Sequence, residues 1–336
     1  MQTNGPTNSG LIDMFDRSIS YLRLSLTDQC NLRCLYCTPK TLSDKLDSDE
    51  LLNYEELLRV VRLAVEMGVR KIRLTGGEPL VRREITTFIH GLSRIDGLED
   101  IRLTTNGVLL QDYAEDLFKA GIKKLNISLD TLRPDRFREI TGGDFFDRVW
   151  RGINVAREMG FSPIKINVVA MNGINDDEFI DFAKLSITEP YQIRFIEFMP
   201  MGKDSVWDKE KYISADTIRK RLEVLGPLKP LTTDGMEGPA RVFQFEGAVG
   251  KIGFISPISH HFCDKCNRLR LTSEGQLRSC LLTDQETDLK KIIRDGGSDE
   301  DIRNALLATI LNKPKGHQLN EKKSGNCHGR MSRIGG

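Results

Sequence analysis

Six of the seven cysteines in this sequence fall into two tight groups, and no other feature constrains the chain as strongly. The first group is Cys30, Cys34 and Cys37, and the second is Cys263, Cys266 and Cys280. Thiols clustered in this way, in a chain without a secretory signal, bind metal or carry out redox chemistry more often than they form disulfides. Cys327 belongs to neither group.

Each group supplies three thiolates, one fewer than a closed metal site needs. A structural zinc site has four ligands, and a four-iron cluster that only transfers electrons has four thiolates. Three thiolates therefore favour an iron–sulfur cluster with one iron left open for a small molecule. Zinc remains an alternative for the second group, because His260 or His261 could provide a fourth ligand.

Short strand-like runs alternate with helical segments between residues 21 and 198, which predicts βα units and a parallel sheet. Six such units favour an incomplete barrel over a closed eight-stranded one. The expected strands are 21–27, 71–75, 100–105, 124–129, 164–170 and 192–198, and the expected helices are 54–67, 82–95, 111–120, 134–140, 146–159 and 176–187.

One face of these strands is polar and carries cations, which is unusual for the packed interior of a βα barrel. Arg23, Arg73 and Lys165 alternate with apolar neighbours such as Leu22 and Ile72. Alternation with period two sends the two sets to opposite faces. If helices cover the apolar face, the polar face lines a wet or ligand-filled lumen; a two-layer sheet with a solvated polar face is the alternative.

The alternation of strand-like and helical segments ends near residue 200, which divides the chain into four predicted regions. We expect a flexible N-terminal extension over 1–18, a partial barrel over 19–205, an α+β region over 206–312 that carries the second cysteine group, and a tail over 313–336. Within the α+β region the sequence predicts strands at 241–246 and 251–256 and helices at 214–225, 287–294 and 299–312.

Charge and hydropathy exclude several classes of protein. Lys and Arg total 49 and Asp and Glu total 48, a formal net charge of +1 that offers no global field for nucleic acid or an anionic membrane. No apolar run approaches the roughly 20 residues of a membrane helix. The first ten residues lack the basic and apolar stretches of a secretory signal, so we expect a cytoplasmic protein with no nucleic-acid or membrane partner.

The first cysteine group and the segments after the other strands resemble the radical S-adenosylmethionine (SAM) superfamily. The resemblance rests on the C-x3-C-x2-C spacing after the first strand and on Gly76-Gly77-Glu78-Pro79 after the second. It implies a four-iron cluster on Cys30, Cys34 and Cys37 that binds SAM and cleaves it with one electron. It also implies that SAM contacts Tyr36, Gly77, Ser128 and Met199.

The second group is similar to one family within that superfamily, the GTP 3′,8-cyclases of molybdenum-cofactor biosynthesis. The matching segments are Cys263-x2-Cys266-Asn-Arg-Leu-Arg-Leu with Cys280, residues 193–200, and the final Ile334-Gly335-Gly336. The family implies a second four-iron cluster whose open iron binds the guanine of GTP. It assigns the GTP contacts to Arg23, Arg73, Thr104, Lys165, Arg268, Leu269 and Arg270.

The family also implies the reaction and its partners. A SAM-derived radical abstracts the ribose 3′ hydrogen of GTP, and the resulting radical attacks carbon 8 of the base. Catalytic roles fall to Arg268, Arg270, Gly335 and Gly336. A flavodoxin or ferredoxin would supply electrons to a monomer or homodimer, and cyclic pyranopterin monophosphate synthase would consume the product.

Two other functions fit parts of the sequence. One is a radical SAM enzyme that modifies a peptide and carries an auxiliary cluster, although such enzymes use more cysteines after the barrel. The other is a zinc-binding regulatory protein without catalysis. The Asn-Arg-Leu-Arg segment after Cys266 and the terminal Gly-Gly favour the nucleotide cyclase.

Overall fold

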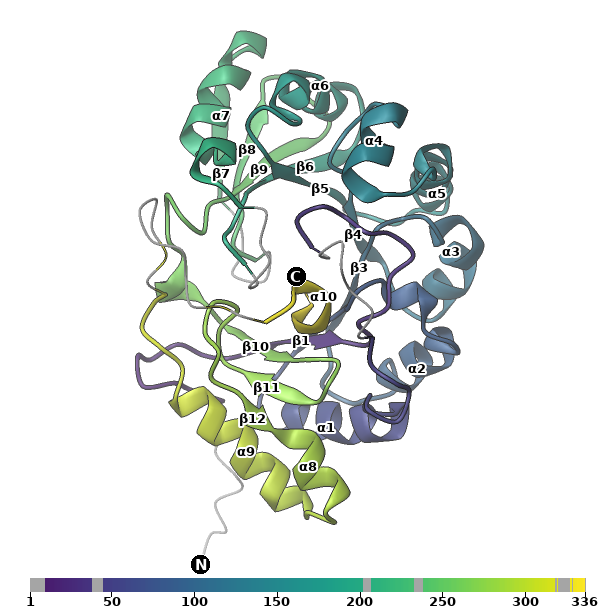
Figure 1. The fold of residues 1–336 in the computed structure, drawn as a ribbon, viewed down its shortest axis with the longest axis vertical. Helices are drawn as coiled ribbons and strands as arrows, with labels where there is room; N and C mark the ends of the chain where they lie inside the picture. The colour runs from purple at the N-terminus through teal and green to yellow at the C-terminus, as the bar shows by residue number, and fades with distance from the viewer. Residues whose placement is uncertain are drawn as a thin grey trace, which may run out of the picture.

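The computed structural model describes residues 10–37, 45–201, 207–232, 238–317, 319, 327 and 329–335. Their strands form one sheet of twelve, in the order β12-β11-β10-β1-β2-β3-β4-β5-β6-β9-β8-β7 (Figure 1). None of the helices within these residues is both long and apolar enough to cross a membrane.

The six βα units lie where the sequence predicts them. The strands are β1 (Tyr21–Ser25), β2 (Lys71–Thr75), β3 (Asp100–Thr105), β4 (Lys124–Ser128), β5 (Ile164–Ala170) and β6 (Tyr191–Glu197). The helices are α1 (Tyr54–Glu66), α2 (Ile85–Leu92), α3 (Leu110–Lys119), α4 (Pro134–Thr141), α5 (Phe146–Glu158) and α6 (Phe179–Thr188). All neighbouring pairs among β1–β6 are parallel, and the helices form the outer layer in Figure 1.

Strands from the C-terminal region extend both edges of this parallel sheet. β9 (Lys251–Ile255) pairs with β6 and β10 (Arg268–Leu271) pairs with β1, both in parallel. The ring stays open because β9 and β10 do not pair with each other; each instead continues into antiparallel strands. These are β7 (Leu228–Leu231) and β8 (Arg241–Phe245) at one edge, and β11 (Gln276–Arg278) and β12 (Thr287–Asp288) at the other.

The predicted incomplete βα barrel is therefore confirmed, with one addition. The C-terminal region does not form a separate layer but adds strands to the same sheet. Strands β7, β10, β11 and β12 were not predicted from the sequence, and β10 carries the Arg-Leu-Arg-Leu segment that follows Cys266.

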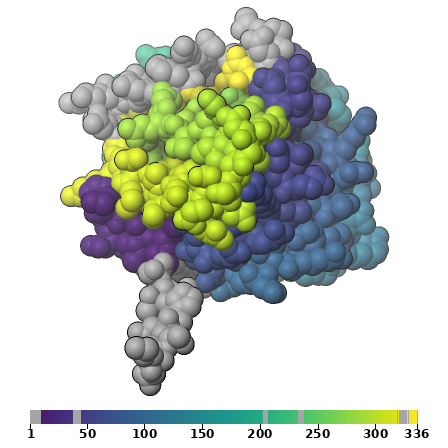
Figure 2. All heavy atoms as spheres, turned by 90° about the horizontal axis from the view of Figure 1, so that it is seen from below, coloured from purple at the N-terminus to yellow at the C-terminus, as the bar shows by residue number. Residues whose placement is uncertain are grey.

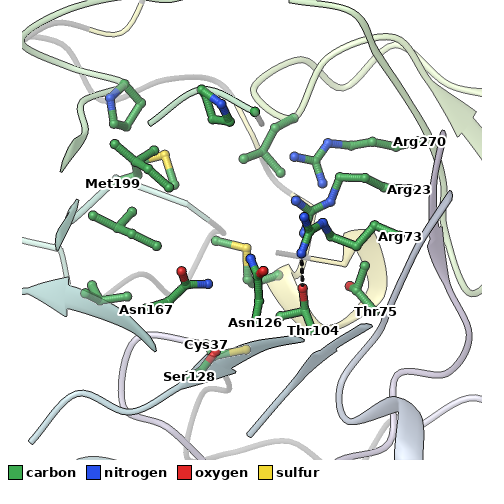
Figure 3. Close-up of a pocket in the computed structure, with 18 of the residues that line it drawn as sticks. Arg23, Cys37, Arg73, Thr75, Thr104, Asn126, Ser128, Asn167, Met199 and Arg270 are labelled. Atoms are coloured by element: carbon green, nitrogen blue, oxygen red, sulfur yellow. Dashed lines mark hydrogen bonds between the residues drawn. The ribbon is translucent and has the colours of Figure 1, made fainter. Parts of the chain in front are cut away.

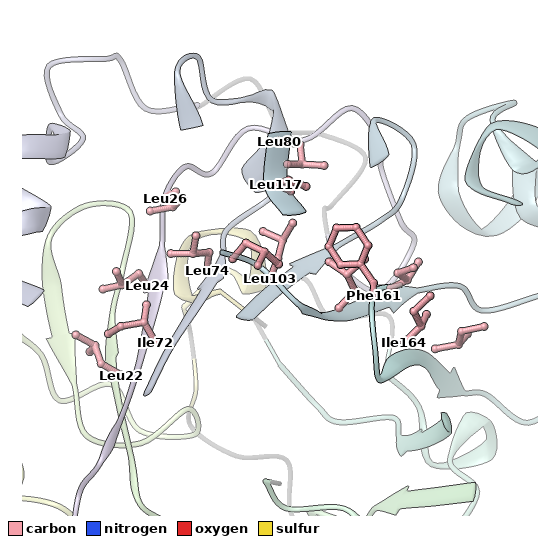
Figure 4. Packing of buried hydrophobic residues seen from close by; sticks show 14 of the residues in the cluster. Leu22, Leu24, Leu26, Ile72, Leu74, Leu80, Leu103, Leu117, Phe161 and Ile164 are labelled. Carbon is pink, nitrogen blue, oxygen red and sulfur yellow. The ribbon is translucent and has the colours of Figure 1, made fainter. Parts of the chain in front are cut away.

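The core lies between the apolar face of the strands and the helices. Leu22, Leu24, Ile72 and Leu74 are fully buried there, as the alternation predicts (Figure 4). Burying an aliphatic side chain of this size contributes about 1.5–3 kcal/mol. Because that face is sealed by helices, the polar side chains of the same strands point into the ring.

The C-terminal helices α7 (Ala215–Leu222), α8 (Leu289–Arg294) and α9 (Asp299–Leu311) match predicted helices. α9 packs on α1 through two ion pairs, Arg59 to Asp299 at 2.6 Å and Arg303 to Glu66 at 2.7 Å. In Figure 2 the yellow-green C-terminal residues lie directly against the purple and blue N-terminal part of the chain. The two regions therefore share one body.

The described residues nearest to each end of the chain have defined positions in the fold. Residues 10–18, expected within a flexible extension, form a small turn in which Leu11, Asp13 and Arg17 are buried. At the other end, the short helix α10 (Met331–Ile334) lies in the middle of the ring, where the C-terminus is marked in Figure 1. Residues 329–335 of the predicted tail therefore lie inside the ring.

Candidate active site

Both cysteine groups line one pocket, which opens inside the ring at the carboxyl ends of the strands. This is the end at which βα barrels carry their catalytic groups. Figure 3 shows polar side chains of several strands pointing into it. The predicted site residues that line it are Arg23, Cys30, Cys34, Tyr36, Cys37, Arg73, Gly77, Thr104, Ser128, Met199, Cys263, Cys266, Arg268, Arg270 and Cys280.

The loop of the first cysteine group is held by a buried carboxylate after β2. Glu78 accepts hydrogen bonds from the Thr105 hydroxyl at 2.8 Å and from the Asn106 main-chain nitrogen at 2.7 Å. The Asn106 side chain in turn donates to Asn31 at 2.7 Å and to the Cys30 sulfur at 3.6 Å. Burial raises the pKa of Glu78 to about 7, although these donors oppose the shift. This chain of contacts fixes Cys30 relative to the ends of β2 and β3.

Gly77 is required where it stands because two stretches of main chain meet there. Its nitrogen donates to the Thr27 carbonyl at 2.7 Å. A Cβ at this position would lie 2.3 Å from the Gln29 carbonyl oxygen, which is closer than real contacts allow. Any side chain would push the loop after β2 away from the loop that carries Cys30.

Tyr36 is tied to the far side of the pocket. Its hydroxyl donates to one Asp130 oxygen at 2.6 Å, while the other oxygen accepts from the Val169 nitrogen at 2.8 Å. Burial raises the pKa of Asp130 to about 6, with both hydrogen bonds acting in the opposite direction. The tyrosine between Cys34 and Cys37 is therefore anchored to the ends of β4 and β5.

Four guanidinium groups converge on the wall formed by β10, β1 and β2. Register places Arg23 between Arg270 and Arg73 on neighbouring strands, and these three side chains lie close together in Figure 3. Arg73 donates to the Tyr21 hydroxyl through Nε and to the Thr104 hydroxyl at 3.2 Å. Arg268 lies on β10 opposite Tyr21.

The charges in this group perturb one another. Burial, together with the like charges of Arg73 and Arg268, lowers the pKa of Arg23 to about 10. Burial and the charges of Arg23 and Arg268 lower the pKa of Arg270 well below its ordinary value. For Tyr21, burial alone would raise the pKa, but the surrounding cations lower it to about 7. These arginines form a binding site suited to an anion, whose negative charge would offset the repulsion between the guanidinium groups.

The second cysteine group sits beside the same cations. Burial alone would raise the pKa of Cys266, but the charges of Arg268 and Lys313 lower it to about 6. His260 was a candidate fourth ligand of the second cysteine group. Its side chain is exposed and contacts Asp216 at 2.6 Å. Among the described residues, His261 and His317 have ligand atoms within 4.8 Å of the Cys263 sulfur and are close enough to share a metal with it.

The tail enters the site through Gly335. Its carbonyl accepts hydrogen bonds from Arg270 at 2.8 Å and from Arg23 at 3.1 Å. Its φ of +76° favours glycine, and a Cβ there would lie 2.5 Å from the Thr75 hydroxyl. Gly336, predicted to act with it, lies outside the described residues.

Two predicted GTP contacts do not line the pocket. Lys165 is fully buried and is not among the lining residues, and the Leu269 side chain packs in the hydrophobic core. Leu269 alternates with Arg268 and Arg270 along β10, which leaves only its main chain available to a ligand. Conversely, Tyr21, Asn126, Asn167 and Arg194 line the pocket and were not predicted, although their place on the polar strand face could have indicated them.

The donor set fits a pair of iron–sulfur clusters. All six grouped cysteines are free thiols and partly exposed to the shared pocket. Each group presents three sulfurs, and a cluster held by three thiolates keeps one iron open to a ligand in the pocket. Cations lie beside the second group, where they favour the thiolate form that a metal requires.

Comparisons with known proteins agree with this geometry. Residues 24–186 match the family model described as the radical SAM superfamily, and residues 191–319 match that described as Molybdenum Cofactor Synthesis C. A GTP 3′,8-cyclase from Thermodesulfovibrio yellowstonii is 51% identical over 306 residues, covering 90% of this chain and 94% of that relative. A GTP 3′,8-cyclase from Alkaliphilus metalliredigens is 45% identical over 324 residues, covering 96% and 99%.

A solved structure adds support for the fold alone. Streptococcus suis SuiB bound to S-adenosylmethionine superposes with a TM-score of 0.59 at 18% identity, covering 84% of this chain and 67% of that one.

Proposed function

The chain belongs to the GTP 3′,8-cyclase family of radical SAM enzymes, and from that premise we propose how its residues divide the reaction. The enzyme cyclises GTP between its 3′ and 8 positions, the first step of molybdenum-cofactor biosynthesis, with SAM and two four-iron clusters as cofactors. When bound, the first cluster and SAM would supply the one-electron chemistry that removes hydrogen from the ribose. The observation that supports our assignment best is that both cysteine groups and the four-arginine wall face one pocket.

Cys30, Cys34 and Cys37 would hold the first cluster, and the groups around them would seat SAM. Tyr36, anchored by Asp130, offers an aromatic face to the adenine. Gly77, Ser128 and Met199 line the same pocket and complete the proposed SAM contacts. Holding reacting atoms near contact distance can lower a barrier by roughly 7–11 kcal/mol, so the rigidity of these contacts is their contribution.

Cys263, Cys266 and Cys280 would hold the second cluster and thereby orient the guanine. The triphosphate would lie against Arg23, Arg73, Arg268 and Arg270, with Thr104 beside them. A polyphosphate brings the negative charge that this buried, mutually repelling group of cations lacks. Leu269 stays in the proposal as a main-chain contact. Lys165 also stays, but its side chain does not line the pocket and would have to rearrange to reach GTP.

Gly335 and Gly336 would complete the site. The Gly335 carbonyl already occupies two of the arginines that we assign to the phosphates. The tail and the triphosphate would therefore meet at the same guanidinium groups, whose five N–H donors each allow both to bind. Only residues without side chains fit against Thr75 at this point.

The partners follow from the chemistry. The reaction needs a low-potential electron donor, for which a flavodoxin or ferredoxin is suited, and its product would pass to cyclic pyranopterin monophosphate synthase. We propose a cytoplasmic location, because the reaction consumes GTP and low-potential electrons, and, from the family resemblance, a monomer or homodimer.

The decisive test is anaerobic incubation of the reconstituted chain with GTP, SAM and dithionite. We expect 5′-deoxyadenosine and a cyclised nucleotide to appear in equal amounts. SAM cleavage that leaves GTP intact but is stimulated by an added peptide would favour the peptide-modifying alternative and overturn the proposal.

A further inference from the structure

Two buried cations lie outside the pocket wall and hold the main chain around the second cysteine group. One contacts the stretch with Cys263, and the other contacts the stretches next to Cys266 and Cys280. They are Arg17, from the N-terminal turn, and Lys313, from the base of the tail. Their exposed fractions are 7% and 4%. Burying a cation costs several kcal/mol unless close partners compensate, so the identity of those partners indicates what the charges are for.

Arg17 joins three separate segments. Its Nη1 donates to the Cys263 carbonyl at 2.8 Å and to the Lys315 carbonyl at 3.0 Å, and its Nη2 donates to the Pro314 carbonyl at 2.7 Å. Its Nε donates at 2.6 Å to Asp13, whose side chain is fully buried. Four of the five N–H groups of the guanidinium are thus committed, which fixes the Cys263 loop to the N-terminal turn and to the tail base.

Lys313 holds the other two cysteines in the same manner. Its ammonium donates to the Arg268 carbonyl at 2.9 Å and to the Ser279 carbonyl. Arg268 follows Cys266 by two residues, and Ser279 immediately precedes Cys280. Because both acceptors are neutral carbonyls, the positive charge of Lys313 remains available to the nearby thiolates of Cys266 and Cys280.

We infer that Arg17 and Lys313 are positioning residues that set the spacing of the second cysteine group and tie it to the base of the tail. Arg17 fixes Cys263, and Lys313 fixes Cys266 and Cys280 while adding positive potential at the cluster. The inference rests on the proposed assignment of the second cluster to these three cysteines. Positive charge beside an iron–sulfur cluster favours its reduced form and raises its reduction potential.

The test uses the full chain with Cys30, Cys34 and Cys37 changed to serine, so that the second cluster alone contributes to the spectrum. Lys313→Met and Arg17→Met are compared with Lys220→Met and Arg151→Met, matched changes at exposed cations. Iron content, the electron paramagnetic resonance spectrum with and without GTP, and the reduction potential are measured. We expect both test variants to alter the spectrum and the controls to leave it unchanged.

The two roles of Lys313 separate in a further variant. Lys313→Met removes the charge and should lower the reduction potential of the cluster. Lys313→Arg keeps the charge and should therefore keep the potential, but its different shape should still alter the spectrum. Spectra and potentials indistinguishable from those of the controls would overturn the inference. A parent serine variant that binds no iron would instead refute the cluster assignment itself.

A variant that loses the cluster altogether is still informative. In the chain with all cysteines intact, Arg17→Met or Lys313→Met would then retain four irons and GTP-independent SAM cleavage if the defect is local. Loss of SAM cleavage as well would mean that the residue supports the fold generally, which contradicts a positioning role.

Discussion

Replacing Arg23 by methionine should stabilise the substrate-free fold while weakening GTP binding. Burial and two neighbouring guanidinium groups lower the pKa of Arg23 to about 10, against an ordinary value of 12.5. At 1.36 kcal/mol per unit, this corresponds to a penalty of about 3 kcal/mol for keeping the side chain charged. Losing its hydrogen bond to Gly335 offsets about 1 kcal/mol, which leaves a gain of about 2 kcal/mol in the free energy of unfolding.

The sign and pH range follow from linkage. The unfolded chain binds this proton more tightly than the folded one, so the penalty is fully present below about pH 10 and fades only as the pH rises toward 12.5. The gain should therefore be constant between about pH 6 and pH 9. Meanwhile, losing a charge-assisted hydrogen bond to phosphate should cost about 1.5–3 kcal/mol, or roughly 10- to 150-fold in Kd for GTP.

Thermal unfolding of the GTP-free chain and calorimetric titration with GTP measure the two effects, with Arg151→Met as the exposed control. We expect a Tm a few degrees above wild type together with the weaker GTP binding. A lower Tm with unchanged affinity would refute the reasoning, because Arg23 would then be a structural residue rather than a cation held in place for substrate.

Three further predictions concern the cysteine groups, the tail and the tyrosine anchor. Cys34→Ser should abolish SAM cleavage, whereas Cys266→Ser should retain uncoupled cleavage but lose GTP cyclisation; product analysis that shows cyclisation by Cys266→Ser would contradict this division. Deleting Gly335 and Gly336 should abolish cyclisation while leaving the iron content of both clusters intact, and full turnover by the truncated chain would reject a role for the tail. Tyr36→Phe leaves the buried Asp130 carboxylate with one hydrogen-bond donor fewer. The free energy of unfolding should therefore fall by about 1–3 kcal/mol, and SAM should bind more weakly. A denaturant midpoint equal to that of wild type would exclude this anchor.

The barrel could be predicted from the sequence because its signals are local. Strands such as β2 and β3 alternate polar and apolar residues with period two, and each is followed by an amphipathic helix. The same alternation placed Arg23 and Arg73 on the inner face, where the structure has them. The spacing of the cysteines along the sequence was likewise sufficient to identify both groups.

The remaining features depend on contacts between distant parts of the chain. β10 is only four residues long, and its partner β1 lies near the other end of the sequence, so no local signal shows that it joins the barrel sheet. The tail helix α10 has little local signal and is held by Arg23 and Arg270. Arg17 and Lys313 acquire their roles only because the ends of the chain meet at the second cysteine group, and nothing in the local sequence of either residue indicates that meeting.

The central claim is that two cysteine groups hold iron clusters with open positions facing one pocket. Electron paramagnetic resonance of the anaerobically reconstituted, reduced chain tests it most directly, with nitrogen-15 GTP and labelled SAM as ligands. Our account predicts about eight irons per chain, with hyperfine coupling from SAM on one cluster and from guanine nitrogen on the other. Zinc in the second group, or clusters whose spectra do not respond to either ligand, would contradict it.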